Sequence, residues 1–326
     1  MTPVDPPAAR EASARVVRVD FGSCTLITEQ GETLEATARG KLMGARKALG
    51  NTVVVGDVAH VTFERERVLI REVAPRRNTF SRRASGERPV EQLVAVNLDQ
   101  VVVVASVANP EFSAGFVDRV LAQAEHSRIS GLLVLNKCDL GSAEEARALL
   151  ADYAIAGYAG QAVSARTGAG VDSLRNDCRG RRSLFVGHSG VGKSTLLNAL
   201  FPGLDLRAGE VNRKTGKGRH TTTAAVLLTP EPGLELIDTP GVRSFGLWGI
   251  GPDDLDQAYP EFRPFLGHCR FADCRHGAEP GCALRDAMHS GEVPARRLES
   301  YFKLREELLA ETSARGGRVR PREPWA

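Results

Sequence analysis

The 326-residue sequence has no long hydrophobic run and little net charge. Its longest apolar runs, such as Val101 to Ala105, are far too short to cross a bilayer, and the first thirty residues hold no apolar segment of signal-peptide length. Because the formal net charge is only +3, any nucleic-acid binding must come from local basic patches. We therefore expect a cytoplasmic protein that makes no membrane contact.

The cysteines show no pattern typical of a disulfide framework. Three of the six are scattered (Cys24, Cys138 and Cys178) and are interpreted as small buried residues, whereas the other three lie close together near the C-terminus. Apolar residues at 42% and charged residues at 25% are typical of globular proteins. The length allows two or three domains of about 100 to 200 residues each.

The most informative stretch is rich in glycine: Gly187-His188-Ser189-Gly190-Val191-Gly192-Lys193-Ser194-Thr195. It fits the phosphate-loop pattern G-x-x-x-x-G-K-[ST] between a predicted strand and a predicted helix. Its glycines let backbone N–H groups surround a phosphate at a helix N-terminus, Lys193 reaches the β and γ phosphates, and the Ser194 hydroxyl is placed to bind Mg²⁺. The alternative, a strand-to-helix turn without a ligand, does not explain the fixed positions.

Between residues 94 and 244, apolar runs alternate with helical periods, which predicts a parallel sheet covered by helices on both faces. We expect strands at Gln100–Ser106, Gly131–Leu135, Gln161–Val163, Ser183–Val186, Ala225–Leu228 and Leu234–Ile237, and helices at Gly115–Ser127, Ser142–Tyr153, Gly170–Asn176 and Lys193–Phe201. Because such sheets bind ligands at the carboxyl ends of their strands, motifs distant in sequence can meet there.

Two strand-end motifs indicate guanine. Asn136-Lys137-Cys138-Asp139 follows one strand, and the ionised Asp139 carboxylate can accept the ring N–H and the exocyclic amine of guanine, a donor pair that adenine lacks. Asn136 is expected to brace the loops and the stem of Lys137 to pack on the base. Ser164-Ala165 follows another strand and could supply a backbone N–H to the guanine oxygen. The alternative is a helix-start aspartate without a ligand.

A third strand-end motif, Asp238-Thr239-Pro240-Gly241, places Asp238 to hold Mg²⁺ through water and the Gly241 N–H to meet the γ phosphate; the alternative is an ordinary strand-end turn. The preceding segment, Arg207 to Thr223, is polar and is predicted to order around the γ phosphate, with Thr222 as the preferred Mg²⁺ ligand and Thr221 as the alternative. Either His220 activates water, or it packs or contacts RNA. Val242 stands where many GTPases carry a glutamine, so intrinsic hydrolysis should be slow.

The N-terminal part is predicted to be a leader over 1–14, a barrel over 15–76 and a linker over 77–93. Short β-rich runs at Val16–Asp20, Cys24–Thr28, Thr33–Ala36, Val53–Val55, Val58–Phe63 and Val68–Val73 favour a five-stranded oligonucleotide-binding (OB) type barrel. The cations of one barrel loop and the arginines of the linker either meet RNA phosphates or are solvated; they are Arg39, Lys41, Arg46, Lys47, Arg76, Arg77, Arg82 and Arg83.

The C-terminal part, 245–312, holds Cys269, Cys274, His276 and Cys282 in the spacing C-x4-C-x-H-x5-C, a complete tetrahedral set for structural zinc. Free reduced thiols are the alternative, and His268 is the spare ligand. Pro294–Thr312 is predicted to be an amphipathic helix with Leu298, Tyr301, Phe302, Leu304, Leu308 and Leu309 partly buried. Residues 313–326 form a basic tail.

The order of its motifs makes the chain resemble the ribosome small-subunit-dependent GTPase A family. These motifs are, along the chain, the guanine motifs, the phosphate loop, Gly218-Arg219-His220-Thr221-Thr222, Asp238-Thr239-Pro240-Gly241-Val242-Arg243-Ser244-Phe245-Gly246 and the Cys-Cys-His-Cys set. This resemblance implies an OB-type barrel, a central α/β circularly permuted P-loop GTPase domain (94–244) and a mostly helical zinc domain. It also implies a late factor in small-subunit maturation that binds ribosomal RNA and hydrolyses GTP when the particle activates it.

The expected ligands are GTP as substrate, Mg²⁺ and one structural Zn²⁺ per chain. The expected partners are the small ribosomal subunit and its RNA, with other assembly factors left open, and the chain is expected to be a monomer.

Two other hypotheses compete with the activated GTPase. One is a nucleotide-gated RNA-binding scaffold, which the absent glutamine at Val242 keeps open; the other is an ATP-dependent enzyme, which Asp139 disfavours.

Overall fold

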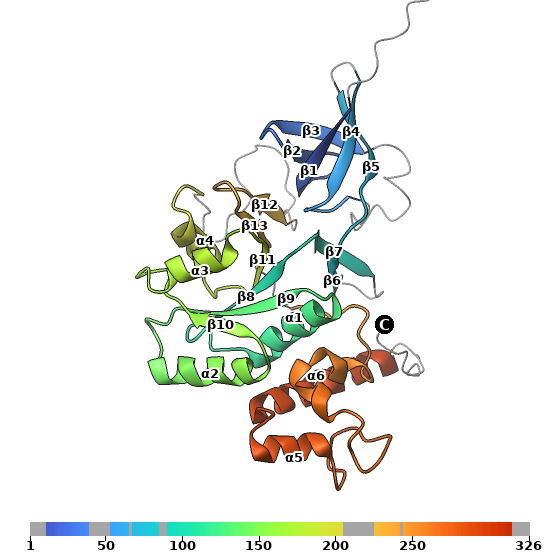
Figure 1. Cartoon of the computed structure of the whole chain (residues 1–326), viewed down its shortest axis with the longest axis vertical. Helices are drawn as coiled ribbons and strands as arrows, with labels where there is room; N and C mark the ends of the chain where they lie inside the picture. Colours follow the sequence, from blue (N-terminus) through green and yellow to red (C-terminus); the bar gives the residue numbers. More distant parts are fainter. Residues whose placement is uncertain are drawn as a thin grey trace, which may run out of the picture.

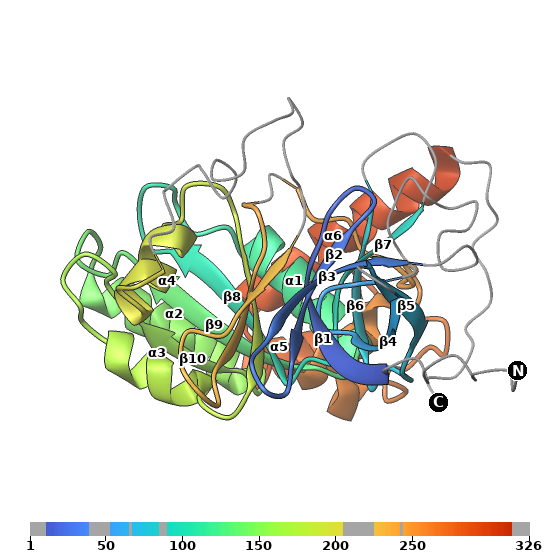
Figure 2. The ribbon, with the colours of Figure 1, turned by 90° about the horizontal axis from the view of Figure 1, so that it is seen from above.

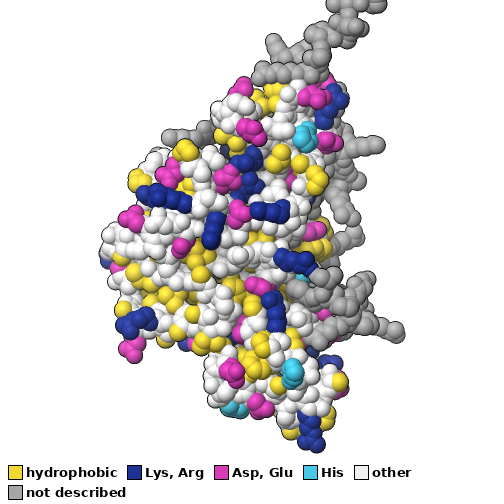
Figure 3. All heavy atoms as spheres, viewed as in Figure 1, with side chains coloured by type: hydrophobic (Ala, Val, Ile, Leu, Met, Phe, Trp, Pro, Cys, Tyr) yellow, Lys and Arg dark blue, Asp and Glu magenta, His cyan; other side chains and the backbone are white. Residues whose placement is uncertain are grey.

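A computed structural model describes residues 11–38, 53–64, 67–84, 90–204, 225–241 and 244–314. A barrel, a central α/β domain and a C-terminal helical domain follow one another along the long axis (Figure 1). Seen from above, the barrel stands beside the central sheet (Figure 2). On the face in Figure 3, Lys and Arg side chains intermingle with Asp and Glu. Within the described ranges, no helix is both long enough and apolar enough to cross a membrane.

Five strands close the barrel: β1 (Glu11–Val19), β2 (Cys24–Thr28), β3 (Thr33–Ala38), β4 (Val58–Glu64) and β5 (Arg67–Val73). They pair in the order β1-β2-β3-β5-β4 and back to β1, and every pair is antiparallel except β3 with β5. Because side chains alternate across a strand, Val16, Leu26 and Ile70 fill the interior. The predicted five-stranded barrel is confirmed.

Two local expectations for the barrel are wrong. Residues 11–14, assigned to an unstructured leader, belong to β1 and pair with β4. Val53–Val55, predicted to be a strand, is a buried turn in which Asp57 Oδ2 accepts the Val54 N–H at 2.7 Å. Asp57 is fully buried and its carboxylate is bound by Arg76 Nε at 2.8 Å. The Asp57 side chain thus accepts the backbone hydrogen bond that a neighbouring strand would otherwise accept. The predicted basic loop lies outside the described residues.

The stretch predicted to be a linker contains most of a hairpin formed by β6 (Thr79–Arg83) and β7 (Glu91–Val96). Phe80 in this hairpin is fully buried and its ring centroid lies 5.7 Å from that of Phe245. The four arginines expected to be solvated or to meet phosphate bind protein groups instead: Arg76 binds Asp57, Arg77 binds Asp99, Arg82 binds Gln92 and Arg83 binds Glu311. These partners lie far away in sequence, except for Gln92.

The central sheet has the strand order β10-β9-β8-β11-β13-β12. Its strands are β8 (Gln100–Ser106), β9 (Ser130–Asn136), β10 (Ala159–Ala162), β11 (Arg182–Gly187), β12 (Val226–Leu228) and β13 (Glu235–Asp238). The neighbours from β10 to β13 are parallel, as predicted, whereas β12 is antiparallel to β13. β12 also pairs with β1 through Arg18 and Val226, so one sheet continues into the barrel.

Helices cover both faces of this sheet: α1 (Ala114–His126) and α2 (Ala143–Ile155) on one, α3 (Val171–Cys178) and α4 (Lys193–Leu200) on the other. The strands are apolar on both sides because both faces are covered; β8 is buried throughout. All four helices lie where the sequence predicts them, within two residues at each end. This layering leaves the strand-end loops as the exposed edge where a ligand can bind.

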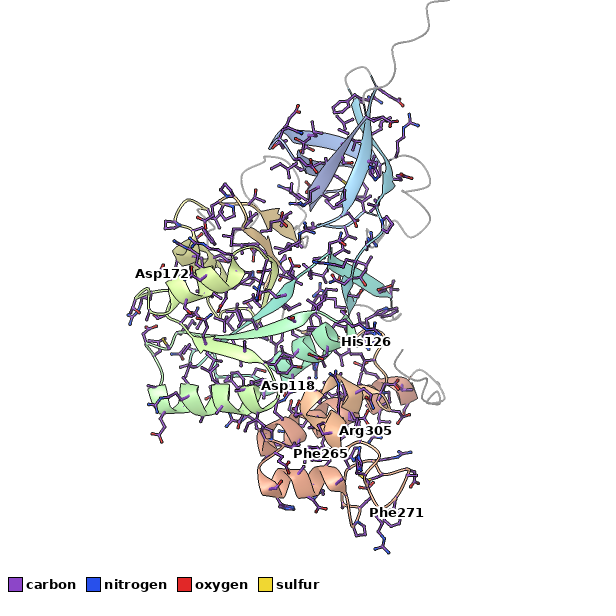
Figure 4. All side chains as sticks on the ribbon, viewed as in Figure 1. Asp118, His126, Asp172, Phe265, Phe271 and Arg305 are labelled. Atoms are coloured by element: carbon purple, nitrogen blue, oxygen red, sulfur yellow. The ribbon has the colours of Figure 1, made fainter. Side chains whose placement is uncertain are left out.

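The C-terminal domain consists of η3 (Leu255–Ala258), η4 (Pro260–Phe265), α5 (Ala283–Ser290) and α6 (Ala295–Ala314). The predicted amphipathic helix is confirmed, with Leu298, Tyr301, Leu304 and Leu308 buried. Arg297 on α6 is 1% exposed and binds Asp118 of α1 at 2.5 Å and Glu261 at 2.7 Å. Figure 4 labels Asp118 where the central and C-terminal domains meet. The domain is thus anchored on α1.

Candidate nucleotide site and metal centre

The glycine-rich loop joins β11 to α4 and passes very close to neighbouring strand ends. Gly190 and Gly192 have φ of +88° and +86°, which favours glycine. A Cβ on Gly187 would lie 2.8 Å from the Val104 carbonyl oxygen, and one on Gly192 would lie 2.6 Å from Asn136 Nδ2. These glycines are therefore required both by the turn and by the close approach of β8 and the Asn136 loop.

Lys193 and Asp238 form a buried ion pair between the loop and the end of β13. Their exposed fractions are 6% and 2%, and Lys193 Nζ donates to Asp238 Oδ1. Burial raises the pKa of Asp238, and Lys193 opposes this rise. Thr239 fixes the strand end by donating its hydroxyl to the Phe185 carbonyl at 2.8 Å.

Asp238 Oδ2 is buried and accepts no hydrogen bond from any residue that the structure describes. A buried carboxylate oxygen without a donor is costly unless a ligand satisfies it. This oxygen lies in the same buried ion pair as the lysine of the phosphate loop. The residues present therefore fit a hydrated divalent cation, for which a carboxylate oxygen is a preferred ligand.

The remaining predicted phosphate-side residues surround this pair. A Cβ on Gly241 would lie 3.4 Å from Ser189 Cα, so the Asp-x-x-Gly turn contacts the glycine-rich loop directly. The His188 ring packs edge-on against Phe116 of α1, with 5.6 Å between centroids. Ser194 is partly buried and Thr195 exposed on the first turn of α4.

Asn136 ties the guanine motifs to the glycine-rich loop. Its Nδ2 donates to the Val191 carbonyl at 2.9 Å, and its Oδ1 accepts the Ala165 N–H at 3.1 Å. The Cys138 N–H adds a bond to the Val163 carbonyl at 3.1 Å. This is the bracing geometry that the sequence predicts for Asn136, and it gathers loops from three different strand ends.

Asp139 points into the same loops and is held by two donors. Ser164 Oγ donates to its Oδ1 at 2.6 Å, and Arg166 Nε donates to its Oδ2 at 2.9 Å. The Ser164 bond is the main cause that holds the pKa of Asp139 below its usual value. The carboxylate is therefore charged at neutral pH and can only accept hydrogen bonds.

Lys137 lies across the glycine-rich loop in a left-handed backbone conformation, with φ of +62°. Its Nζ donates to the Gly190 carbonyl at 2.7 Å and also to the Asn109 carbonyl. The aliphatic stem therefore runs between the Asp139 loop and the phosphate loop, where the predicted base would pack.

The expectation that Ser164-Ala165 offers a backbone N–H to a guanine oxygen meets an obstacle. The Ser164 N–H donates to the Ala169 carbonyl at 2.9 Å, and the Ala165 N–H donates to Asn136. Either bond would have to be given up for the predicted contact. Ser164 contributes its hydroxyl instead, a role that the sequence analysis missed.

Four residues proposed from the sequence lie outside the described residues: His220, Thr221, Thr222 and Val242. Their placement relative to Lys193 and Asp238 stays a prediction.

The four predicted zinc ligands lie together, with all ligand atoms within 4.8 Å of one another. His276 Nδ1 is 3.5, 3.6 and 3.8 Å from the sulfurs of Cys282, Cys269 and Cys274, and the Cys269 and Cys282 sulfurs are 4.0 Å apart. Tetrahedral zinc bonds predict separations of about 3.6 Å for nitrogen to sulfur and about 3.8 Å for sulfur to sulfur. The set fits zinc. His268, the spare candidate, is exposed and outside it.

Asp256 on η3 is a residue at this centre that sequence reasoning missed. Its Oδ2 lies 3.8 Å from His276 Nε2, on the side of the ring away from the thiols. This separation is too long for a hydrogen bond, so Asp256 supports His276 electrostatically from the far side of the ring. Asp256 precedes the nearest cysteine by thirteen residues and belongs to no motif, so no sequence signal marks it.

The comparisons with known proteins agree with this geometry. Residues 73–248 match the RsgA GTPase family. A Gemmatimonas aurantiaca protein named small ribosomal subunit biogenesis GTPase RsgA is 45% identical over 300 residues, which cover 90% of this chain and 96% of the relative. A Pseudomonas aeruginosa protein of the same name is 47% identical over 230 residues, or 70% of this chain and 67% of the relative.

Solved structures extend the likeness to the whole fold. The crystal structure of YjeQ from Thermotoga maritima superposes with a TM-score of 0.73 at 32% identity, covering 92% of this chain and 99% of that one. The structure titled YloQ, a circularly permuted GTPase, superposes with a TM-score of 0.69 at 24% identity, covering 96% and 98%, and supports the fold alone. The family match, the relatives and the gathered strand-end loops lead to one conclusion: the chain belongs to the RsgA GTPase family.

Proposed function

We propose that this protein is a GTPase that acts late in the biogenesis of the small (30S) ribosomal subunit, binds its RNA and hydrolyses GTP to GDP and phosphate when the subunit activates it. The family and the names of its relatives support this function. The observation that carries it is the meeting of the Asp139, Lys193 and Asp238 loops at one sheet edge, with Asn136 bridging two of them.

On the base side, Asp139 accepts the ring N–H and exocyclic amine of guanine, and the stem of Lys137 packs on the base. The lowered pKa of Asp139 keeps its carboxylate ionised across the physiological range. Because adenine offers no matching donor pair, the site selects GTP over ATP.

On the phosphate side, the glycine-rich loop from Gly187 to Thr195 surrounds the phosphates with N–H groups, and Lys193 turns from Asp238 to the β and γ phosphates. Ser194, Thr222 and Asp238 would hold Mg²⁺, with Asp238 acting through its partnerless Oδ2 and a water molecule. When bound there, the cation would supply positive charge against the negative charge that develops on the phosphates. Gly241 lies against Ser189, so its N–H is near the γ phosphate region.

For the attacking water, we assign His220 as the positioning or general base residue, because Val242 cannot supply the amide that orients water in many GTPases. Basal turnover should then be slow, and binding to the subunit should bring His220 and Thr222 to the γ phosphate. The guanine motifs precede the phosphate loop, so this order is circularly permuted relative to the usual one and the Asp238 segment leads directly into the C-terminal domain.

We assign one structural zinc ion per chain to Cys269, Cys274, His276 and Cys282. All four ligands come from the protein, so the metal stabilises the fold and leaves no open position for catalysis. We further propose that residues 11–76, 94–244 and 245–312 act as barrel, GTPase and zinc domains of a cytoplasmic monomer.

The test is GTP hydrolysis by the full chain alone, with purified small subunits and with large subunits. We expect slow turnover alone and a rise of about 10²-fold or more with small subunits only, as ordering a catalytic group typically gives. Turnover that small subunits leave unchanged would remove the proposal.

A second candidate is a nucleotide-gated RNA-binding scaffold in which hydrolysis is incidental; the apolar Val242 favours it. The substitution His220→Ala separates the two. A scaffold should still support subunit maturation without hydrolysis, whereas the activated GTPase should stay trapped on the particle.

A further inference from the structure

Arg166 binds the Asp139 carboxylate, which is the hydrogen-bond acceptor that guanine would use. Its Nε donates to Asp139 Oδ2 at 2.9 Å, and its Nη2 lies 2.7 Å from the same oxygen. The other oxygen, Oδ1, accepts the Ser164 hydroxyl at 2.6 Å. Both oxygens of the guanine-selecting carboxylate are therefore engaged within the protein.

A count of lone pairs shows the conflict. A carboxylate oxygen accepts about two hydrogen bonds in its plane. Arg166 places two donors at Asp139 Oδ2, while Ser164 leaves one position at Oδ1. Guanine needs one acceptor position on each oxygen for its ring N–H and its exocyclic amine, so it can bind fully only if Arg166 withdraws at least one donor.

Exposure decides which partner moves. The Arg166 side chain is 73% exposed, whereas the Asp139 side chain is 12% exposed and Ser164 is fully buried. A guanidinium at the surface exchanges a protein acceptor for water at little cost. Asp139 is held by Ser164 and cannot follow it. Arg166 is thus the mobile member, and the carboxylate stays in place for the base.

We propose that Arg166 competes with guanine for Asp139 and so lowers the affinity of this protein for guanine nucleotides. This inference rests on the proposed function. Arg166 covers the carboxylate in this structure, and the guanidinium turns into solvent when the base enters. The apparent affinity is reduced by the fraction of molecules in which the carboxylate is covered. Arg166 therefore tunes the affinity for GDP at the base end of the site.

The test is GDP and ADP binding with Mg²⁺ by calorimetry, on the full-length protein and on Arg166→Ala. We expect Arg166→Ala to lower the Kd for GDP about two- to fivefold at low salt, the range typical of an exposed ion pair. The ratio of the Kd of the unaltered protein to the Kd of Arg166→Ala should approach one near 1 M salt, where exposed charges are screened within about 3 Å. The Kd of Arg166→Lys for GDP should lie between those of the unaltered protein and Arg166→Ala. Lysine keeps the positive charge but lacks the planar guanidinium that places two N–H donors on one carboxylate oxygen.

Arg179→Ala is the matched control. Arg179 is another exposed arginine paired with an acid, Glu231 at 3.7 Å, at the opposite ends of the strands, so this variant should leave GDP binding unchanged.

Three results would overturn the inference. Equal or weaker GDP binding by Arg166→Ala at low salt would show that Arg166 does not compete, and weaker binding would mean that it packs on the bound base. An equal gain for ADP would place the effect away from the base edge. If the unaltered protein itself bound GDP no better than ADP, the proposed function would fail together with the inference.

Discussion

The barrel and the C-terminal domain are attached to the central domain in different ways. The barrel has a buried cluster of its own, which includes Val16, Leu26 and Ile70. It is linked to its neighbour by the β1–β12 pairing, by the Val96 N–H that donates to the Val55 carbonyl at 3.1 Å, and by the partly exposed ion pair of Arg15 with Glu235. Of the described barrel residues, only Val55 is buried in the central cluster, with Val17 and Val19 packed against it, so the barrel shares a small part of that core.

The C-terminal domain instead shares the core of the central domain. Tyr259, Phe262 and Leu298 belong to the same buried cluster as Val117 and Leu121 of α1. At its centre, the guanidinium of Arg297 lies 4.4 Å from the ring centroid of Tyr259 and binds Asp118 and Glu261. Separating these domains would expose apolar surface and unpair buried charges, both of which are costly.

Three modules that follow one another in sequence are therefore not three independent bodies. A domain with its own core can change orientation at little cost, whereas one that shares a core must move with its partner. Helix α1 contacts both the C-terminal domain through Asp118 and the glycine-rich loop through Phe116. The zinc domain is thus mechanically tied to the nucleotide site through its shared core, whereas the barrel reaches Asp238 through the strand pairing of β1 with β12 and of β12 with β13.

The largest effect should follow loss of the metal. Cys282→Ser should lower bound zinc from about one ion per chain to nearly none, and the shared core should lose stability because the binding energy of structural zinc is folding energy. Zinc content by mass spectrometry and thermal unfolding measure this.

Cys178→Ser is the control for zinc content, because burial raises the pKa of that thiol to about 11 and keeps it protonated and a poor ligand. Full zinc retention by Cys282→Ser would refute the assigned centre.

The next effect should come from the buried arginine. Arg297→Ala leaves Asp118 and Glu261 buried without their counter-ion, so the free energy of unfolding should fall by about 3–5 kcal/mol. Denaturant unfolding should show the central and C-terminal domains losing stability together.

The neighbouring Arg296→Ala removes a largely exposed pair with Asp152 and should change the free energy of unfolding by less than about 0.5 kcal/mol. The shared core would be disproved if Arg297→Ala unfolded the C-terminal domain but left the denaturant midpoint of the central domain unchanged.

The smallest effect should appear at the barrel junction. Glu235→Ala removes the partly exposed ion pair with Arg15 and the pair with Arg182, whose side chain is 10% exposed. Because Arg182 keeps its bonds to the Gly56 and Asn97 carbonyls, we expect a loss of about 1–2 kcal/mol. Calorimetry should show this loss shrinking at high salt. A loss as large as that of Arg297→Ala would erase the contrast between the two junctions.

Sequence reasoning succeeded where local pattern decides the structure. The turn at Gly190 and Gly192 follows from consecutive residues, and the strands that precede Asn136 and Asp238 are continuous apolar runs. The barrel, the order of the motifs and the cluster of Cys269, Cys274, His276 and Cys282 were predictable for the same reason.

It failed where a side chain finds a partner far along the chain. Arg83 meets Glu311 and Arg297 meets Asp118, across 228 and 179 residues, and nothing in either neighbourhood marks these pairs. Arg166 was missed because its partner, Asp139, already had a role. Val53–Val55 was misread because burial, which the apolar run does predict, is not the same as strand pairing.

We propose that Asp139 selects the base in a site shared with Lys193. Binding of GDP and of xanthosine diphosphate (XDP) should be measured for the unaltered chain and for Asp139→Asn. Xanthine carries an oxygen where guanine carries its amine, so an asparagine amide suits it and a carboxylate does not. We expect the preference for GDP to collapse or reverse in the variant, by roughly 10³-fold or more in the affinity ratio. An unchanged preference for GDP in Asp139→Asn would contradict the account.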